Sequence, residues 1–337
     1  MMLSNRMTRV DADPDDVLPC LRQVGGSEQW RTARLLGKTG SHVAYKVETW
    51  SGECFHLRLG QATSTEHNQT EGLLIDRVYQ ILDQQNLMIT PALKLAGCGR
   101  IYQDQRSYLL THWIDGLNGR LHAHRLGQSQ GYRLGISAGL ALAAVHSLAG
   151  PDSPSAWAQE ITSRCRWLEK GLTRNVKRHR AVAAALDFVN HNRSIICSRP
   201  VCALYNNLAF DQMIMYRDIA AILINFSQWR YGDPLFDLAP VLTDISRISI
   251  PFATGLLDCY LSQQCNTRIM RSIVFYAALR TLEQLSRSSE RQVPDQTALR
   301  VIERLAADTD CFGQVIPCWY PPKRLSGHGS SHLWLSS

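Results

Sequence analysis

The residues best suited to chemistry lie in one segment, which runs from Cys202 to Val241 and reads CALYNNLAFDQMIMYRDIAAILINFSQWRYGDPLFDLAPV. It contains Asn207, then Gln212 after four further residues, and then Asn225. Side-chain amides can orient a hydroxyl group or offer an oxygen to a cation. They cannot accept a proton as a general base does, and they bring no negative charge to a metal ion.

Two carboxylates close this segment, Asp233 in Gly-Asp-Pro and Asp237 in Asp-Leu-Ala. Other kinds of site have less support. His122 and His124 would share one face of a strand, but no third ligand follows at metal spacing, so we interpret them as surface histidines. The ten cysteines form no C-x-x-C pair and are expected to be reduced thiols rather than a disulfide framework.

The elements before this segment fall into two groups. From Trp30 to about Gly116, short β-favouring runs are separated by glycine-marked turns, which indicates an antiparallel sheet with one helix. After Gly116 the apolar residues recur with the period of a helix. We expect strands at 32–36, 42–48, 54–59, 93–96 and 107–113, helices at 69–82, 132–148 and 269–285, and a mostly helical stretch at 155–190.

The chain is therefore expected to have an α+β fold with two lobes, the first small and sheet-rich, the second larger and mainly helical. We assign residues 1–29 to an N-terminal extension, 30–116 to the N-lobe and 117–309 to the C-lobe. Residues 310–337 are rich in Gly, Pro and Ser, which indicates a loosely ordered tail.

The segment YGDPLFDLA, from Tyr231 to Ala239, resembles the stretch after the metal-binding loop in the aminoglycoside phosphotransferase and choline/thiamine kinase-like family. In that family of small-molecule relatives of protein kinases, a strand leads to H-G-D-x-x-x-x-N, and a hairpin leads to I-D-(F/W)-(G/E) and G-D-P-x-x-D-L-A. The chain keeps this spacing without a gap. The resemblance implies the two-lobed kinase-like fold of the aminoglycoside phosphotransferases, and it places Tyr205 where the family has His.

The resemblance extends to the N-lobe. GKTGSHVAYKV, which begins at Gly37, resembles the hairpin that covers the nucleotide phosphates, and HLRLG, which ends at Gly60, resembles the third strand. It implies a vestigial nucleotide site that comprises Gly37, Gly40, Ser41, Arg58 and Glu71. Arg58 and Glu71 would form either an ion pair that clamps phosphates or a partly exposed pair that only ties a strand to a helix.

Two of the departures from the family pattern remove a carboxylate from the reaction centre. The family's catalytic Asp is Asn207 here and its metal-binding Asp is Asn225, while its metal-binding Asn is the longer Gln212. Loss of a general base typically costs about 10²–10⁴ in rate, and Mg²⁺ usually binds one or two carboxylates together with phosphates. We therefore expect Asn207 to be inactive and positions 212 and 225 not to bind metal. The resemblance also implies that Asp237 braces the catalytic loop.

Positive charge is concentrated in one segment, from Arg164 to Arg180. It holds seven basic residues against Glu169 alone, a charge of +6 in a chain of 337 residues whose net charge is +7. Such a segment argues against a cationic acceptor such as an aminoglycoside or choline and favours an acidic partner: nucleic acid, an anionic lipid surface or an acidic protein patch. No DNA- or RNA-binding motif accompanies it, so nucleic acid is not the expected partner. A solvated helix face is the alternative interpretation.

Three hypotheses follow. The first is a catalytically degenerate, pseudokinase-like protein that regulates or scaffolds through contacts with another protein. The second is an active phosphotransferase with a non-standard site, for which ATP and Mg²⁺ would be cofactors; the first hypothesis expects none. The third is a protein that binds a nucleotide or metabolite without turnover. The first 16 residues lack a hydrophobic segment after their charges, and no apolar run is long enough to span a membrane, so we expect a cytoplasmic protein.

Overall fold

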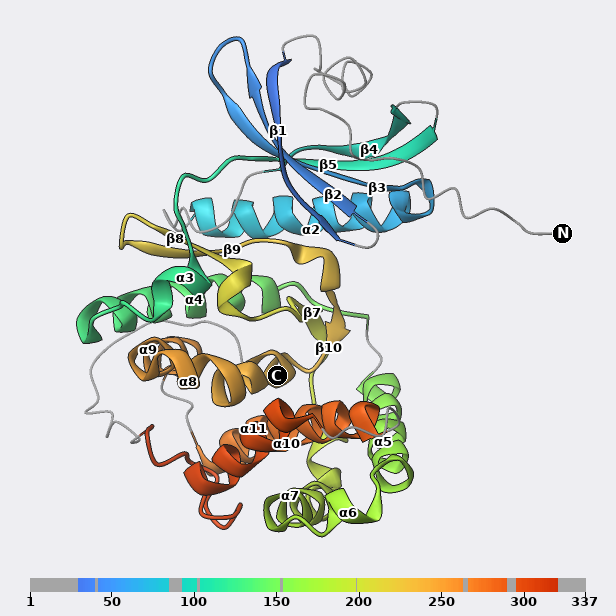
Figure 1. Cartoon of the computed structure of the whole chain (residues 1–337), viewed down its shortest axis with the longest axis vertical. Helices are drawn as coiled ribbons and strands as arrows, with labels where there is room; N and C mark the ends of the chain where they lie inside the picture. Colours follow the sequence, from blue (N-terminus) through green and yellow to red (C-terminus); the bar gives the residue numbers. More distant parts are fainter. Residues whose placement is uncertain are drawn as a thin grey trace, which may run out of the picture. The chain divides into compact units, whose positions relative to one another are not determined.

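The computed structural model divides into two compact units (Figure 1). The sheet unit comprises Met1–Asn86 and Thr90–Asp115, and the helical unit comprises Leu87–Ile89 and Gly116–Ser337. This division falls where the sequence pattern changes from short strands to helices. The residues that the structure describes are 30–39, 42–84, 93–101, 104–151, 154–197, 199–262, 266–289 and 295–320.

The sheet unit consists of a five-stranded antiparallel sheet and one long helix, α2 (Figure 1). The strand order is β1-β2-β3-β5-β4. Side chains along β2 alternate between half-buried and buried, the period that places every second residue on one face of a sheet. The elements are β1 (Trp30–Thr39), β2 (His42–Thr49), β3 (Cys54–Gln61), η2 (Ala62–Ser64), α2 (Thr65–Gln84), β4 (Leu93–Ile101) and β5 (Asp104–His112).

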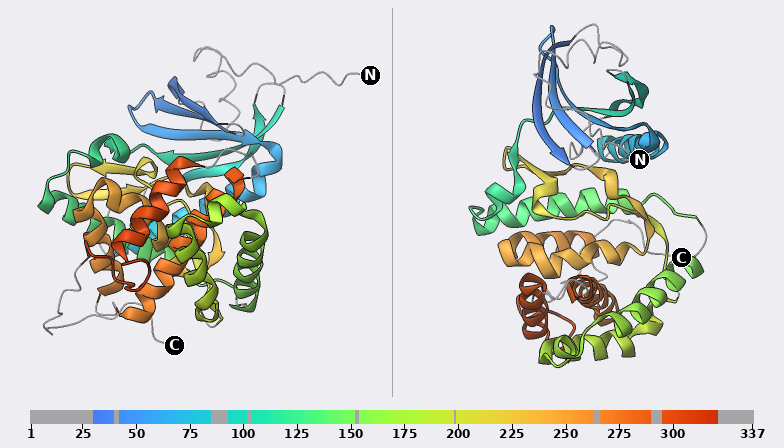
Figure 2. Two further views of the ribbon diagram at one scale, coloured as in Figure 1. Left: turned by 60° about the horizontal axis from the view of Figure 1, so that its bottom comes forward. Right: turned by 45° about the vertical axis from the view of Figure 1, so that its right-hand side comes forward.

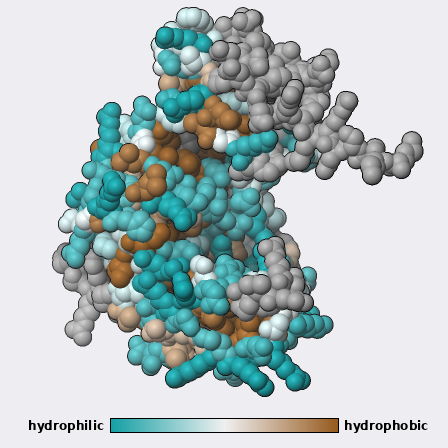
Figure 3. All heavy atoms as spheres, in the orientation of Figure 1, coloured by the Kyte–Doolittle hydropathy of each residue, from teal (hydrophilic) through white to brown (hydrophobic). Residues whose placement is uncertain are grey.

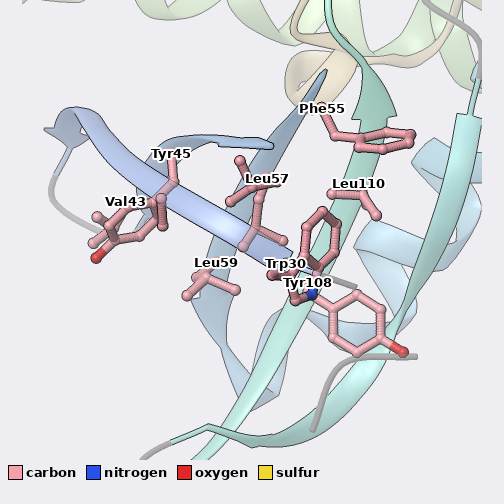
Figure 4. Packing of buried hydrophobic residues seen from close by; sticks show 10 residues of the cluster. Trp30, Val43, Tyr45, Phe55, Leu57, Leu59, Tyr108 and Leu110 are labelled. Carbon is pink, nitrogen blue, oxygen red and sulfur yellow. The ribbon is translucent and has the colours of Figure 1, made fainter. Parts of the chain in front are cut away.

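The core of the sheet unit is built from side chains of β1, β2, β3 and β5 (Figure 4). The Trp30 and Phe55 rings meet edge to face with their centroids 5.8 Å apart. The three strands predicted at 32–36, 42–48 and 54–59 are confirmed, and the helix predicted at 69–82 lies inside α2. The later strand pair is also present, and β4 is longer than predicted.

The helical unit is organised around the close packing of α4 (Gln128–His146) and α9 (Ile250–Leu261), which lie side by side (Figures 1 and 2). Glycines let the two backbones approach. A Cβ atom on Gly135 would lie 2.1 Å from the carbonyl oxygen of Phe252, and one on Gly255 would lie 2.1 Å from that of Tyr132. No side chain fits at either position without separating the helices.

Short strands and turns connect the helices of this unit. Two small antiparallel sheets, β6-β8-β9 and β10-β7, hold the segment from Cys202 to Val241. The remaining elements are β6 (Leu117–Asn118), α3 (Gly119–Ala123), α5 (Pro154–Gly171), α6 (Arg174–Lys177), α7 (Arg180–His191), η3 (Arg193–Ile196), β7 (Cys202–Leu204), η4 (Phe210–Gln212), β8 (Met213–Tyr216), β9 (Ala220–Leu223), η5 (Phe226–Gln228), β10 (Arg230–Gly232), η6 (Pro234–Leu238), η7 (Val241–Ile245), α8 (Ser246–Ile248), α10 (Thr267–Ser289) and α11 (Gln296–Asp308).

Two details differ from expectation. Residues 310–320, expected to begin a loose tail, pack onto the helical unit. Phe312 is buried and stacks on Phe188 at 5.2 Å between centroids, and the Tyr320 hydroxyl donates to Asp258 Oδ1 at 3.0 Å. His122 lies in the short helix α3 rather than on a strand. Among the described residues, no helix is both long and apolar enough to cross a membrane.

Candidate functional site

The loop that follows β7 is held by one buried carboxylate. Asp237 Oδ2 accepts the backbone N–H of Tyr205 at 2.6 Å, and Oδ1 accepts that of Asn206 at 2.9 Å. Asn206 has a φ of 58°, a left-handed conformation that asparagine tolerates better than most residues. Asp237 is completely buried, so its two backbone bonds fix the loop in a strained turn. This is the bracing role that the sequence implied for Asp237.

Asp237 is itself supported from α4 and α9. His146 Nε2 lies 3.1 Å from Asp237 Oδ2, and His146 Nδ1 lies 2.6 Å from the hydroxyl of Tyr260. Burial raises the pKa of Tyr260 well above its usual value, and the nearby Cys202 and acidic side chains raise it further. The phenol therefore stays neutral, and it fixes the orientation of the imidazole. The sequence did not predict this support.

The second carboxylate, Asp233, holds the turn after β10. Its side chain accepts the backbone N–H of Leu235 at 3.0 Å and the hydroxyl of Tyr276 at 2.8 Å, and it pairs with Arg199 Nε at 2.8 Å. Burial lowers the pKa of Arg199, but the charge and hydrogen bond of Asp233 outweigh that effect, so the net shift is upward. The Gly-Asp-Pro turn is thus fixed by buried, paired groups.

The three amide positions lie together in the helical unit. Asn225 Nδ2 donates to Gln212 Oε1 at 2.9 Å, and Asn207 Nδ2 lies 3.4 Å from the carbonyl oxygen of Asn225. Ser227 Oγ donates to Asn225 Oδ1 at 2.7 Å. Asn225 has a φ of 59°, again the left-handed region. The structure therefore brings Asn207, Gln212 and Asn225 together, and their side chains bond to one another and to the local backbone.

Tyr205 connects the two loops that carry the amide side chains, the loop after β7 with Asn207 and the loop after β9 with Asn225, which we call the amide loops. Its ring is fully buried against Phe226, with centroids 5.0 Å apart. Its hydroxyl lies 3.1 Å from the carbonyl oxygen of Gln212 and also contacts that of Ile224, the residue before Asn225. A phenol at the family's histidine position thus connects the backbones of both amide loops. The sequence identified the substitution but did not predict this contact.

The donor set of these loops does not fit a bound Mg²⁺. All three side chains are neutral, and two of their oxygens accept hydrogen bonds from neighbouring side chains. Magnesium usually binds through one or two carboxylates and phosphates with strict octahedral geometry. Among the described residues, no group of three or more His, Cys, Asp or Glu side chains could hold a metal ion. Asp211, the nearest acid in sequence, is exposed in η4.

In the sheet unit, Arg58 and Glu71 form a bidentate ion pair. Arg58 Nη1 donates to Glu71 Oε1 at 3.0 Å, Nη2 contacts Oε2, and Nη2 also donates to Asn68 Oδ1 at 3.1 Å. All three residues are buried, so the pair is not the partly exposed one that was considered. Gly37 lies in β1 beside a register shift, and Gly40 and Ser41 lie outside the described residues.

His56, two residues before Arg58 on β3, makes the stability of the sheet unit depend on pH. Burial, followed by the charge of Arg58, lowers the pKa of His56 to about 4. Because the folded-state pKa lies below the value of about 6.5 for an unfolded chain, the unfolded state binds the extra proton between these values. This contribution to stability is fully present above pH 6.5 and is lost as the pH falls towards 4.

We expect the wild-type protein to lose about 2–3 kcal/mol more of its free energy of unfolding than the variant His56→Gln between pH 7 and pH 4. Urea unfolding at each pH measures the difference. The control is His191→Gln, which removes an exposed histidine and should follow the wild type. If the free energy of unfolding of the wild type and of His56→Gln changed equally with pH, the inferred shift in the pKa of His56 would be wrong.

Comparisons with known proteins agree with this geometry. The model of the phosphotransferase enzyme family matches residues 32–271. An aminoglycoside phosphotransferase APH(4)-Ia in its apo form is 15% identical, with a TM-score of 0.57 over 86% of this chain and 97% of that one. A GDP complex of an aminoglycoside 2'-phosphotransferase-IIIa mutant is 12% identical, with a TM-score of 0.61 over 90% of this chain and 100% of that one.

A gentamicin complex of APH(2")-IIa is 14% identical, with a TM-score of 0.54 over 88% of this chain and 97% of that one. At these identities the solved structures show the fold alone, and they confirm the predicted kinase-like α+β class. A search of curated proteins found no match.

Proposed function

The chain belongs to the phosphotransferase enzyme family, and we propose that it is a catalytically degenerate member that acts through protein contacts rather than by phosphoryl transfer. One observation carries this proposal. At the three positions where the resemblance implies a catalytic base and two metal ligands, the side chains are amides that bond to one another and to the backbone.

The chemistry of those amides explains the proposal. Phosphoryl transfer needs a metal ion on the nucleotide phosphates and a group that orients or deprotonates the acceptor hydroxyl. Asn207 cannot take that proton, and the Asn225–Gln212 hydrogen bond occupies an oxygen that a metal ion would need. Binding Mg²⁺ would require breaking this bond without gaining a favourable charge interaction. We accordingly propose that the protein needs neither ATP nor Mg²⁺ as a cofactor.

The supports around the amide loops favour a retained scaffold. Asp237 and Asp233 are both fully buried and fully engaged, with partners drawn from the loops and from α4 and α10. A chain that keeps these buried networks while its reactive positions are neutral can still present a stable surface. The proposed role, in the cytoplasm, is therefore regulation or scaffolding.

The proposed contact face is a basic surface on α5, α6 and the start of α7, which we define by five exposed side chains: Arg166, Lys170, Arg174, Arg178 and Arg180. Hydrophilic side chains project from this end of the helical unit (Figures 1 and 3). Arg164 does not contribute, because it is paired with Glu283 inside the unit. Five like charges on one face favour an acidic protein partner.

Calorimetric titration with ATP, with and without Mg²⁺ or Mn²⁺, together with a hydrolysis assay, tests the catalytic part. We expect no metal-dependent heat and no hydrolysis from the wild type. The variant Asn207→Asp/Gln212→Asn/Asn225→Asp restores the family's residue types and is expected to gain metal-dependent nucleotide binding. Asn175→Asp adds a carboxylate on exposed α6 and is the control. Metal-dependent hydrolysis by the wild type would establish an active phosphotransferase instead, and binding without hydrolysis a nucleotide-binding protein.

A second arm of the same test addresses the contact face, with poly-glutamate as the acidic probe. We expect the wild type to bind it in a salt-dependent manner and Arg174→Glu/Arg178→Glu to bind at least about tenfold more weakly. The matched control is Arg125→Glu/Arg133→Glu, which reverses two exposed charges at α4 and just before it. Equal losses in both double variants would mean that only net charge matters, and the assignment of the face would fail.

A further inference from the structure

The helical unit contains a cavity of about 1090 Å³ that none of the steps above uses. Side chains of α5, α10 and the loop after β7 line it, and all of them belong to the helical unit. Cavities of this size hold metabolite-sized molecules. Four arginines and four acids contribute to its wall, so the chemistry of any ligand depends on which of these charges are already paired.

Two of the acids are neutralised by arginines. Glu283 accepts two hydrogen bonds of 2.6 Å from Arg164, a bidentate pair. Glu160 lies 3.5 Å from Arg164 and also bonds to Arg230. Burial lowers the pKa of Arg164, but Glu283 and Glu160 outweigh that effect and the net shift is upward. Neither acid is therefore available to attract a cationic ligand.

The other two acids are held by hydrogen bonds. Asp295 is the N-cap of α11, where the backbone N–H of Ala298 and then Gln284 and the N–H of Thr297 lower its pKa against the opposing effect of burial. Asp244 accepts a hydrogen bond from the Thr243 hydroxyl at 2.8 Å. Among the described residues, neither of them forms an ion pair with an arginine of the cavity.

Arg280 is different, because it forms no ion pair among the described residues. Its guanidinium lies 4.7 Å from the centroid of the Phe236 ring, and Nη1 is buried without a hydrogen-bond partner among the described residues. Burial lowers the pKa of Arg280, Arg164 lowers it further, and the opposing charges of Asp237, Asp244 and Glu283 do not restore it. A desolvated cation that lacks a directly paired counter-ion is costly, and an anion bound in the cavity would offset that cost.

Three residues of α10 extend this site along one face of the helix. Arg280, Gln284 and Arg287 line the same cavity, and spacings of four and three residues place them one above another. Arg287 is exposed and has no ion pair among the described residues. The helix thus offers two guanidinium groups, two turns apart, with an amide between them.

We propose that this cavity binds a small molecule with at least one carboxylate or phosphate group, which Arg280 and Arg287 would hold. Hydroxyl side chains in the wall, such as Thr281 and Ser163, would recognise polar groups elsewhere on the ligand. The proposal goes beyond the proposed function, since it requires neither nucleotide nor metal, and none of Asn207, Gln212 and Asn225 lines the cavity.

Calorimetric titration and thermal unfolding test this proposal, with citrate, inorganic pyrophosphate and gentamicin as the probes. Both are done in the presence of EDTA and at a constant ionic strength set with NaCl. We expect one of the two anions, or both, to bind saturably with one site per chain, whereas gentamicin, a polycation, does not. Citrate alone would identify a carboxylate ligand, pyrophosphate alone a phosphate ligand, and both together a site for either group. Arg280→Gln should bind at least about tenfold more weakly.

Arg166→Gln is the matched control, because it removes an exposed guanidinium of the basic surface and lies outside the cavity; it should bind within about twofold of the wild type. Arg287→Gln changes an exposed side chain, so it is expected to fold, and as a second test it should also weaken binding. Without ligand, Arg280→Met should unfold at or above the wild-type temperature, since it removes an unbalanced charge. No saturable binding of either anion, saturation by gentamicin alone, or equal losses in Arg280→Gln and Arg166→Gln would overturn the proposal.

Discussion

Asp237→Ala is expected to lower the free energy of unfolding of the helical unit by about 3–5 kcal/mol, the largest effect of any single substitution near the amide loops. The carboxylate is completely buried and serves two backbone N–H groups and the ring of His146. Alanine leaves these groups without an acceptor and opens a cavity. Each buried group that loses its partner costs about 1–3 kcal/mol. Urea unfolding, followed by circular dichroism, measures the loss.

Two further variants separate this explanation from a general sensitivity of the region. Asp237→Asn keeps the shape and one acceptor oxygen, so its free energy of unfolding should lie between those of the wild type and Asp237→Ala. Asp211→Ala removes an exposed carboxylate of η4, and its free energy of unfolding should stay within about 0.5 kcal/mol of the wild-type value. If Asp237→Ala costs no more than Asp211→Ala, the Asp237 bonds do not hold the loop.

Much of the fold could be predicted because its signals are local. Glycine-marked turns separate the predicted strands, and Gly52, between β2 and β3, adopts a φ of 85°, which favours glycine. Alternating burial in β2 follows directly from its alternating sequence. The resemblance to the family placed Asn207, Gln212 and Asn225 in one site, and the structure brings their side chains together.

The hydrogen bonds within the site could not be predicted, because they depend on contacts between distant segments. Which way the Asn225 amide points is set by Gln212 and Ser227 together, and a sequence pattern does not encode side-chain orientation. The same holds for Tyr205, whose hydroxyl reaches two carbonyl oxygens in separate loops. Arg280 gave no signal at all, since an arginine in an amphipathic helix is ordinarily solvated.

Composition was misleading in two places. Glycine and proline after Thr309 predicted a loose tail, yet Phe312 and Tyr320 are buried against helices that precede them by more than 50 residues. The segment from Arg164 to Arg180 carries a charge of +6 by sequence, but its first residue, Arg164, is an internal ion-pair partner. Charge counts along a sequence do not distinguish a solvated cation from a paired one.

The Arg58–Glu71 pair yields the second large effect. We expect Arg58→Met to lower the free energy of unfolding of the sheet unit by about 3–5 kcal/mol, because it leaves the fully buried carboxylate of Glu71 without its cation. Arg58→Met/Glu71→Leu should recover most of that loss, since apolar side chains of similar volume replace a buried pair at little cost. Urea unfolding of the wild type, of Arg58→Met, of Glu71→Leu and of the double variant completes a double-mutant cycle.

An exposed pair on the same sheet provides the control. Arg31 on β1 and Glu48 on β2 are 3.7 Å apart with half and a third of their side chains exposed, so Arg31→Met should cost no more than about 0.5 kcal/mol. A double variant at 58 and 71 as unstable as Arg58→Met would mean that packing of the arginine, rather than its charge, stabilises the sheet unit. Recovery would show the opposite. The pair is then replaceable for folding, and a requirement for it would have to come from a ligand.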